Sequence, residues 1–283
     1  MIVTKIIGGL GNQLFQYAVA RHLAYIYNTV VRIDTSLFNN YRVHQYSLHH
    51  FNLKGEIIWQ GEDTRGFIRR LFMRLLSGGS SVSRVVEQSF AYDASILNLP
   101  DNVYLEGYWQ SEKYFKSIES IIREEFTVIT PPDSQNAEMA AQITGCNALS
   151  LHVRRGDYVS NPKANAHHGT CTMDYYKQAV ELTAKQVSSP VFFVFSDDIE
   201  WVKTNLQVDF PTVYVDHNGP EKNYEDLRLM SLCKHNIIAN SSFSWWGAWL
   251  NSNKEKLVYA PQRWFAGADH NTKDLIPEGW IRL

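Results

Sequence analysis

Residues 2–18, IVTKIIGGLGNQLFQYA, decide the class of fold. The apolar and largely β-branched run Ile2–Ile7 predicts a short strand, and the apolar pattern from Asn12 to about Asn28 predicts a helix. Between them lie three glycines, at positions 8, 9 and 11. The segment therefore predicts a strand, a tight turn and a helix, an order that places backbone N–H groups and a helix N-terminus where phosphates often bind.

The glycine turn is open to three interpretations. Gly9-x-Gly11 after a strand, with Asp34 at the end of the next predicted strand, partly matches a nicotinamide-binding fingerprint. Leu14 stands where that fingerprint has its third glycine, which allows the helix and strand to pack closely. The turn thus fits a dinucleotide, another ligand or a purely structural role, and its own residues do not choose among them.

Alternating strands and helices continue along the chain. Strands are predicted at 29–33, ending on Asp34, and at 148–153, 191–196, 212–216, 236–240 and 256–260. Helices are predicted at 174–187, 224–235 and 243–253, and residues 102–115 predict a strand that enters an aromatic-rich helix. This alternation predicts an α/β protein with parallel sheets that bind ligands at the carboxyl ends of their strands. The rigid, polar stretch TPPDS at 130–134 predicts a boundary between domains at 1–130 and 135–283.

The composition narrows the class of protein. The chain has 283 residues, of which 45% are hydrophobic and 13% aromatic, with a net charge of −2. A net charge this small creates no positive electrostatic field that would attract nucleic acid. The aromatic content is typical of proteins that bind the flat faces of sugars or bases. The odd cysteine count of three argues against a disulfide framework. The absence of a membrane-length apolar run or a signal-peptide pattern predicts a cytoplasmic protein.

The segment 63–76 predicts an amphipathic helix with a basic face. Arginines at 65, 69, 70 and 74 lie opposite its apolar side. The segment fits either a solvated helix packed on its domain or a helix lying on an anionic membrane surface, Arg65–Arg74 being the contact.

Charged side chains follow two of the predicted strands. In HVRRGDYV (152–159), Arg154 and Arg155 can offer planar forks to phosphate oxygens, and Asp157 can hold an arginine or accept a proton. In FSDD (195–198), Asp197 and Asp198 can bind a guanine edge, ribose hydroxyls or a metal. The alternatives are a surface ion-pair cluster for the arginines and a helix cap for one aspartate.

ANSSFSWWGAWLN (239–251) predicts a strand, a hydroxyl-rich turn and an aromatic helix. Ser241, Ser242 and Ser244 lie at a helix start, where free N–H groups make a phosphate cradle, and one of them is expected to cap the helix. The tryptophans at 245, 246 and 249 fit a core stripe better than a sugar platform. His167, His168 and Cys171 form a weak candidate metal cluster that a polar loop explains better.

Together these motifs resemble the bacterial α-1,2-fucosyltransferases of glycosyltransferase family 11. GGLGNQLFQYA, GYWQSEKYF, HVRRGDYV, FSDD and DLRLMSLCKHNIIANSSFSWWGAWLN carry the resemblance, from residue 2 to about 265. The H-x-R-R-G-D element is shared with α-1,6- and protein O-fucosyltransferases. Residues 55–95 show no resemblance, and the choice of acceptor can reside there.

The resemblance implies a GT-B-like fold with two facing Rossmann-type domains. The N-terminal domain would lie on the acceptor side, and the C-terminal domain would bind GDP-fucose, without metal or other cofactor. The implied catalytic positions are Arg154, Asn12 and Asp157. The implied donor-binding positions are His152, Arg155, Asp197, Asp198, Ser241, Ser242, Phe243, Ser244, Gly9 and Gly11.

Several of these positions have specific implied roles. Arg154 would contact the β-phosphate, Asp197 would read guanine, and Asn12 would face the reaction centre. His152 would lie near the nucleoside. Asp157 would orient Arg154 or lie near the acceptor, and the catalytic base stays open.

The implied reaction is inverting transfer of L-fucose from GDP-β-L-fucose to the 2-hydroxyl of a galactose or similar residue. The acceptor would be a galactose-containing oligosaccharide or lipid-linked glycan in O-antigen, capsule or exopolysaccharide synthesis, with the enzyme in the cytoplasm or peripheral on the inner membrane face. Two rival functions are an NAD-dependent oxidoreductase and a non-enzymatic sugar-binding protein.

Overall fold

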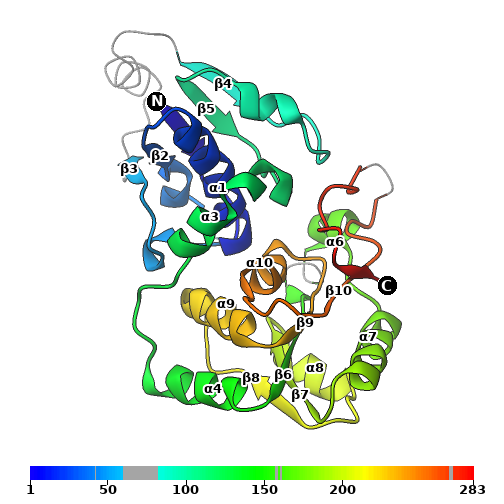
Figure 1. Cartoon of the computed structure of the whole chain (residues 1–283). Helices are drawn as coiled ribbons and strands as arrows, with labels where there is room; N and C mark the ends of the chain where they lie inside the picture. The colour runs from blue at the N-terminus through cyan, green and yellow to red at the C-terminus, as the bar shows by residue number, and fades with distance from the viewer. Residues whose placement is uncertain (42, 60–81, 157–158, 160, 268–269) are drawn as a thin grey trace. The chain divides into compact units, whose positions relative to one another are not determined.

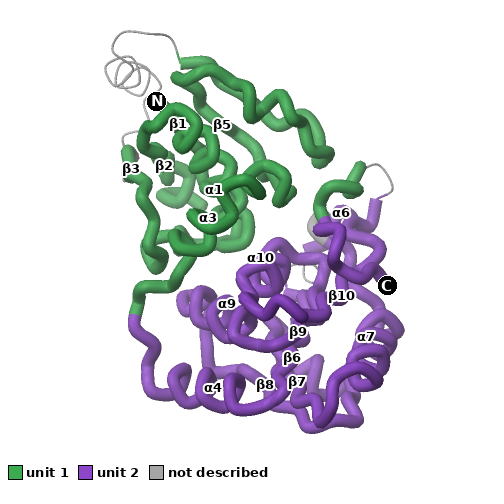
Figure 2. Tube along the Cα trace, viewed as in Figure 1, with its two compact units in different colours: residues 1–130, 271–275 green, residues 131–270, 276–283 purple. Residues whose placement is uncertain are grey.

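The chain folds into two compact units (Figure 2). The computed structural model describes residues 1–41, 43–59, 82–156, 159, 161–267 and 270–283. Unit 1 comprises Met1–Thr130 and Asn271–Leu275, and unit 2 comprises Pro131–His270 and Ile276–Leu283. Residues 271–275 thus belong to the N-terminal unit, although they lie far beyond the predicted boundary at 130–134.

Unit 1 is built on a five-stranded parallel sheet with the order β3-β2-β1-β5-β4. Its strands are β1 (Ile2–Lys5), β2 (Val31–Asp34), β3 (Glu56–Trp59), β4 (Ser83–Val86) and β5 (Val103–Glu106). Its helices are α1 (Leu10–Ile26) and α3 (Glu119–Glu125), with 3-10 turns η1 (Ser36–Asn39), η2 (Leu48–His50), η3 (Ala94–Asn98), η4 (Glu112–Tyr114) and η5 (Lys116–Ile118). The strand order reverses between β1 and β5, which is where open parallel sheets bind ligands.

Helix α1 forms because its sequence is apolar on most faces, as a helix at the centre of a unit must be. Its side chains are buried on most faces from Leu10 to Ala24. Gly9 occupies the N-cap position in an extended conformation and supplies no side-chain cap. The helix therefore begins at Leu10, inside the glycine turn and ahead of the predicted start at Asn12.

Unit 2 is built on a six-stranded parallel sheet with the order β11-β10-β9-β6-β7-β8. Figure 1 labels the strands β6 to β10 of this sheet. Its strands are β6 (Asn147–Val153), β7 (Pro190–Ser196), β8 (Thr212–Val215), β9 (His235–Ile237), β10 (Val258–Ala260) and β11 (Ile281–Arg282). Its helices are α4 (Ser134–Thr144), α6 (Pro162–His168), α7 (Met173–Gln186), α8 (Ile199–Asn205), α9 (Asn223–Leu232) and α10 (Ser242–Leu250), with the 3-10 turn η6 (Pro220–Lys222). Numbered along the chain, this is the doubly wound Rossmann order, whose switch point lies between β6 and β9.

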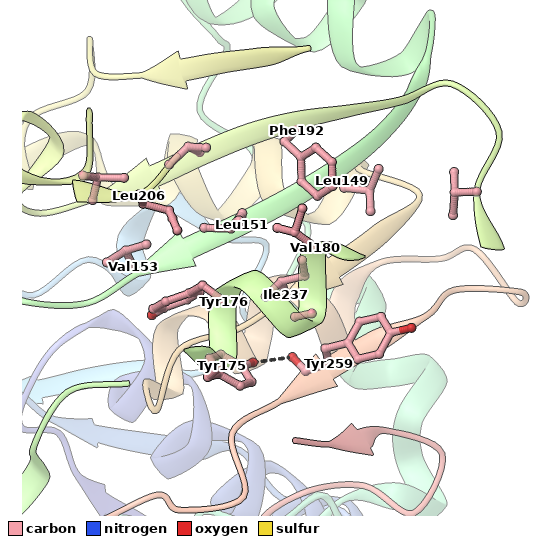
Figure 3. Close-up of a cluster of buried hydrophobic side chains, with 14 residues drawn as sticks. Leu149, Leu151, Val153, Tyr175, Tyr176, Val180, Phe192, Leu206, Ile237 and Tyr259 are labelled. Carbon is pink, nitrogen blue, oxygen red and sulfur yellow. Dashed lines mark hydrogen bonds between the residues drawn. The ribbon is translucent and has the colours of Figure 1, made fainter. Parts of the chain in front are cut away.

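One part of the core of unit 2 lies where α7 packs on this sheet (Figure 3). Leu151 of β6 and Tyr176 of α7 belong to one buried apolar cluster. The buried Tyr175 hydroxyl lies 2.6 Å from the carbonyl oxygen of Ile238 and 3.0 Å from that of Tyr259. Because a buried hydroxyl without a partner is costly, these contacts let an aromatic side chain fill the core while its polar end bonds to the backbone.

The predicted α/β class with parallel sheets is confirmed, but one predicted element is wrong. Residues 107–111 do not enter a helix; they form a tight turn in which Trp109 has a φ of 56°. Only the short turns η4 and η5 follow before α3. Across the described segments, no helix is both long and apolar enough to cross a bilayer.

Candidate functional site

The charged motifs of unit 2 meet at the switch point of its sheet. Residues 154–156 follow β6, residues 197–198 follow β7, and the serine-rich turn follows β9. Because β7 and β9 pair on either side of β6, the carboxyl ends of these three parallel strands lie together. The sheet topology therefore brings together three motifs that the sequence separates.

Arg154 is held by Asp197. The Arg154 guanidinium nitrogen Nη1 lies 2.8 Å from Asp197 Oδ2, and the backbone N–H of Arg155 donates to Asp197 Oδ1 at 2.8 Å. A Cβ atom at Gly156 would lie 2.4 Å from Asp197 Oδ2. Glycine at 156 thus leaves the space in which this carboxylate holds the arginine.

Arg155 has a different set of partners. Its Nε lies 3.2 Å from Asp198 Oδ2, and its guanidinium carbon lies 3.4 Å from the centre of the Trp201 ring. Asp198 is the N-cap residue of α8, but among the described contacts its side chain makes no capping hydrogen bond. The alternative that Asp198 serves only as a helix cap is therefore not supported. The sequence analysis did not predict a role for Trp201, whose only signal was its place three residues beyond Asp198.

His152 presents a neutral buried ring. Burial, and secondarily the charge of Arg154, lower its pKa to about 3, so the imidazole is uncharged at neutral pH. Its side chain is 5% exposed, and its Nδ1 has no hydrogen-bond partner among the described residues. The ring lies 5.8 Å from that of Phe243, in the first turn of α10. A buried, unpartnered ring nitrogen is available to a ligand that supplies the missing bond.

Ser241 starts helix α10. Its hydroxyl accepts from the N–H of Phe243 at 3.3 Å, which confirms that one serine of the motif is a cap. Ser244 Oγ lies 3.4 Å from the Ser241 carbonyl oxygen, so this hydroxyl also faces the turn. A helix N-terminus at the switch point of a Rossmann sheet favours an anionic group.

Asn240, for which the sequence analysis predicted no role, links this turn by hydrogen bonds to two neighbouring loops, at 168–169 and 264. It is 3% exposed, and its Nδ2 lies within 3.2 Å of the carbonyl oxygens of His168, Gly169 and Trp264. The only signal in the sequence was its place at the end of a predicted strand, immediately before the serines.

The tryptophans of α10 belong to the core. Trp245 and Trp246 are 0% exposed and Trp249 is 3% exposed, with the rings of Trp245 and Trp246 5.0 Å apart. Such burial excludes them as a platform for a sugar.

In unit 1, Asn12 lies in the first turn of α1. Gln110 Nε2 donates to Asn12 Oδ1 at 2.8 Å. Gly8 has a φ of +85°, and a Cβ atom there would lie 2.8 Å from Asn12 Nδ2. Gly9, whose Cα faces the His44 ring, and the buried Gly11 complete the turn.

The nicotinamide interpretation is not favoured. Asp34, which would have to bind a ribose, is 1% exposed, and its Oδ2 accepts from the Tyr104 hydroxyl at 2.6 Å. Leu14 is fully buried in α1, where the fingerprint would need a glycine.

Some predicted features lie outside the described residues, namely Asp157 and the helix at 63–76 with Arg65–Arg74. Within the described part of the chain, no group of three or more His, Cys, Asp or Glu side chains could hold a metal ion. His167 and His168 instead contact Phe265, at ring distances of 5.0 and 5.8 Å.

The chain is similar to known proteins along most of its length. The family model for glycosyl transferase family 11 matches residues 88–283. An α-1,2-colitosyltransferase of Escherichia coli is 34% identical over 292 residues, covering 100% of this chain and 99% of that protein. The E. coli O-antigen biosynthesis glycosyltransferase WbnK is 31% identical over 303 residues, covering 98% of each.

The fold is similar to that of the fucosyltransferase NodZ from Bradyrhizobium. The TM-score is 0.53 at 13% identity, covering 87% of this chain and 90% of that one. This likeness confirms the GT-B-like class that the family resemblance implied. On the family match and the full-length relatives, the chain belongs to glycosyl transferase family 11.

Proposed function

We propose that this chain transfers L-fucose from GDP-β-L-fucose to the 2-hydroxyl of a galactose or similar residue of a glycan, with inversion at the anomeric carbon. The observation that carries the proposal is the pairing of Arg154 with Asp197 at the switch point of unit 2, beside the start of α10. The likeness to an α-1,2-colitosyltransferase and an O-antigen glycosyltransferase supports the linkage and the class of acceptor.

The chemistry follows from the charges at this switch point. As the bond between the fucosyl anomeric carbon and the phosphate oxygen breaks, negative charge develops on GDP. Arg154 and the N-terminus of α10 stabilise that charge, because preorganised donors act where charge develops. The acceptor oxygen attacks the opposite face of the anomeric carbon, and its proton passes to a base, for which Asp157 is the candidate.

The nucleoside of GDP is proposed to lie near His152. The neutral ring with its unpartnered Nδ1 can hydrogen-bond an uncharged group without repelling Arg154. Both oxygens of Asp197 are engaged by Arg154 and by the backbone of Arg155, which favours holding the arginine over reading guanine. Arg155, Asp198, Ser241, Ser242, Phe243 and Ser244 complete the proposed donor site.

Unit 1 is proposed to bind the acceptor. Asn12 lies at the switch point of its sheet, between β1 and β5, whereas the neighbouring Gly9 and Gly11 keep their predicted role as donor-binding positions, through backbone that approaches the donor sugar. An amide side chain there can hydrogen-bond an oxygen of the reacting groups.

The test is incubation with GDP-fucose and a panel of β-galactosides, followed by linkage analysis. An α-1,2-linked fucosyl product supports the proposal. If calorimetry shows GDP binding but no galactoside is turned over, the proposal that galactose is the acceptor is contradicted. If GDP does not bind, the rival function of a non-enzymatic sugar-binding protein describes the chain better.

A second candidate is transfer of colitose in the same linkage, which the 34% identical colitosyltransferase favours. A nucleotide-activated colitose belongs in the same assay as a competing donor. The donor with the higher kcat/KM identifies the sugar that the chain transfers.

We expect turnover to be independent of divalent metal, because the cationic role is assigned to Arg154 and the α10 N-terminus. Excess EDTA should leave the rate nearly unchanged. A loss of activity that magnesium or manganese restores would instead assign Asp197 and Asp198 as metal ligands.

The proposed location is the cytoplasm, with segment 63–76 either packed on unit 1 or lying on the inner membrane face. We expect the packed form, in which case the protein stays in the supernatant when sedimented with anionic liposomes at physiological salt. Co-sedimentation that is lost when Arg69 and Arg70 are both changed to glutamine would establish membrane contact through the basic face.

A further inference from the structure

The switch point of unit 1 carries two turns that face each other. The Gly8–Asn12 turn follows β1, and residues 107–111 form a turn after its neighbour β5. The hydrogen bond from Gln110 to Asn12 joins the two turns across 98 residues of sequence. The position of the Asn12 amide therefore depends on the shape of the 107–111 turn.

Glu87 holds that turn from the end of β4. Its Oε2 accepts from the N–H of Tyr108 at 2.6 Å, and its Oε1 accepts from the N–H of Trp109 at 2.9 Å. Burial raises the pKa of this carboxyl, and the two backbone hydrogen bonds oppose that rise. Both carboxylate oxygens of a half-buried side chain are thus used on two consecutive backbone amides.

The turn needs this support because its conformation is unfavourable. Trp109 has a φ of 56°, in the left-handed region that a bulky side chain rarely adopts, and it is 1% exposed. Such a conformation persists only when the surrounding structure imposes it. A Cβ atom at Gly107 would lie 2.4 Å from Glu87 Cβ, so only glycine lets the carboxylate come this close.

The two ends of the turn are fixed as well. Ser111 Oγ donates to the Asp274 carbonyl at 2.7 Å, and Gln16 Nε2 donates to the Gly107 carbonyl at 3.1 Å. Glu87 is the carboxylate that binds the two residues immediately before Gln110.

We propose that Glu87 is a positioning residue for the transfer reaction, which acts by fixing the 107–111 turn so that Gln110 orients the Asn12 amide. The inference rests on the proposed role of Asn12 near the reacting groups. Glu87 itself touches no reacting atom, and its contribution reaches the chemistry through Gln110.

The test compares Glu87→Gln and Glu87→Ala with a matched control, Glu106→Gln. Glu106 immediately precedes the same turn, but its carboxylate pairs with Lys5 and Arg84 and with no amide of the turn. Glutamine at 87 keeps one acceptor oxygen and loses the other. Alanine removes both, and the N–H groups of Tyr108 and Trp109 then lose their acceptor. We expect kcat to fall roughly tenfold for Glu87→Gln and roughly 10²-fold for Glu87→Ala, because small misplacements of reacting groups have effects of this size.

The KM for GDP-fucose should stay within about twofold of wild type, since the proposed contacts with the GDP part of the donor lie in unit 2 and only positioning is lost. In an Asn12→Ala background, Glu87→Gln should have no further effect, because the group that it positions is gone. Glu106→Gln should retain wild-type kcat, and its melting temperature shows what loss of a neighbouring carboxylate does to stability alone.

Two outcomes overturn the inference. Wild-type kcat in Glu87→Gln would show that the turn does not need both hydrogen bonds, and an additive loss in the double variant would show that Glu87 does not act through Asn12. If Asn12→Ala alone is fully active, the proposed role of Asn12 fails, which is a different result from a silent Glu87 beside an essential Asn12.

Discussion

Replacing Arg154 by lysine is expected to lower kcat by roughly 10²-fold or more, the loss typical of one preorganised charge-stabilising group. Lysine keeps the positive charge but has no planar fork with donors at fixed angles. In the wild type, the Asp197 carboxylate fixes the guanidinium at 2.8 Å. The proposed contact with the β-phosphate is expected to strengthen as the fucosyl bond stretches, so its loss should lower kcat more than it raises the KM for GDP-fucose.

The matched control for this variant is Arg155→Lys. Arg155 is the adjacent arginine, but it pairs with Asp198 and stacks on Trp201. Steady-state kinetics with GDP-fucose should show a clearly smaller fall in kcat for this variant. If Arg154→Lys keeps the wild-type kcat and only needs more donor, Arg154 is a binding residue and the proposed mechanism is wrong.

Replacing Asp197 by alanine is expected to weaken GDP binding by about 2–4 kcal/mol. The reason is that the Arg154 guanidinium and the Arg155 backbone amide both lose the carboxylate that holds them. Calorimetry with GDP and ADP separates the two roles of the carboxylate. If Asp197 holds Arg154, both affinities fall by the same factor and their ratio is unchanged. If it reads guanine, the preference for GDP over ADP collapses.

Asp198→Ala is the control for the Asp197 variant. Asp198 is the next residue on the same loop, is 38% exposed, and contacts Arg155 and not Arg154. Its loss should change GDP affinity far less. Unaltered GDP affinity in Asp197→Ala would remove Asp197 from the donor site altogether.

The elements that the sequence predicted have local causes. The β-branched run Ile2–Ile7 contains β1, and the apolar residues after the glycine turn form α1. The predicted strand at 148–153 corresponds to β6, whose residues are almost all buried. Long apolar segments of this kind specify their own secondary structure, because one arrangement buries their side chains.

The elements that the sequence missed depend on their neighbours. Strands β3, β4 and β11 lie at sheet edges and have two to four residues each. Three of the four residues of β4 are exposed, so no apolar pattern marks it. Such strands form because a neighbouring strand offers hydrogen bonds, and that neighbour is not visible in the local sequence.

The sequence by itself determined the α/β class, the motifs of the family and the residue types at the proposed donor site, because each depends on residues close together in the chain. Only the tertiary structure decided which residues act together. Asp197 is 42 positions from the Arg155 amide that it accepts, and Gln110 is 98 positions from Asn12. Glu87 meets its turn only because β4 pairs with β5. These pairings depend on strand order, which brings the ends of distant strands to one edge of a sheet and which no local pattern encodes.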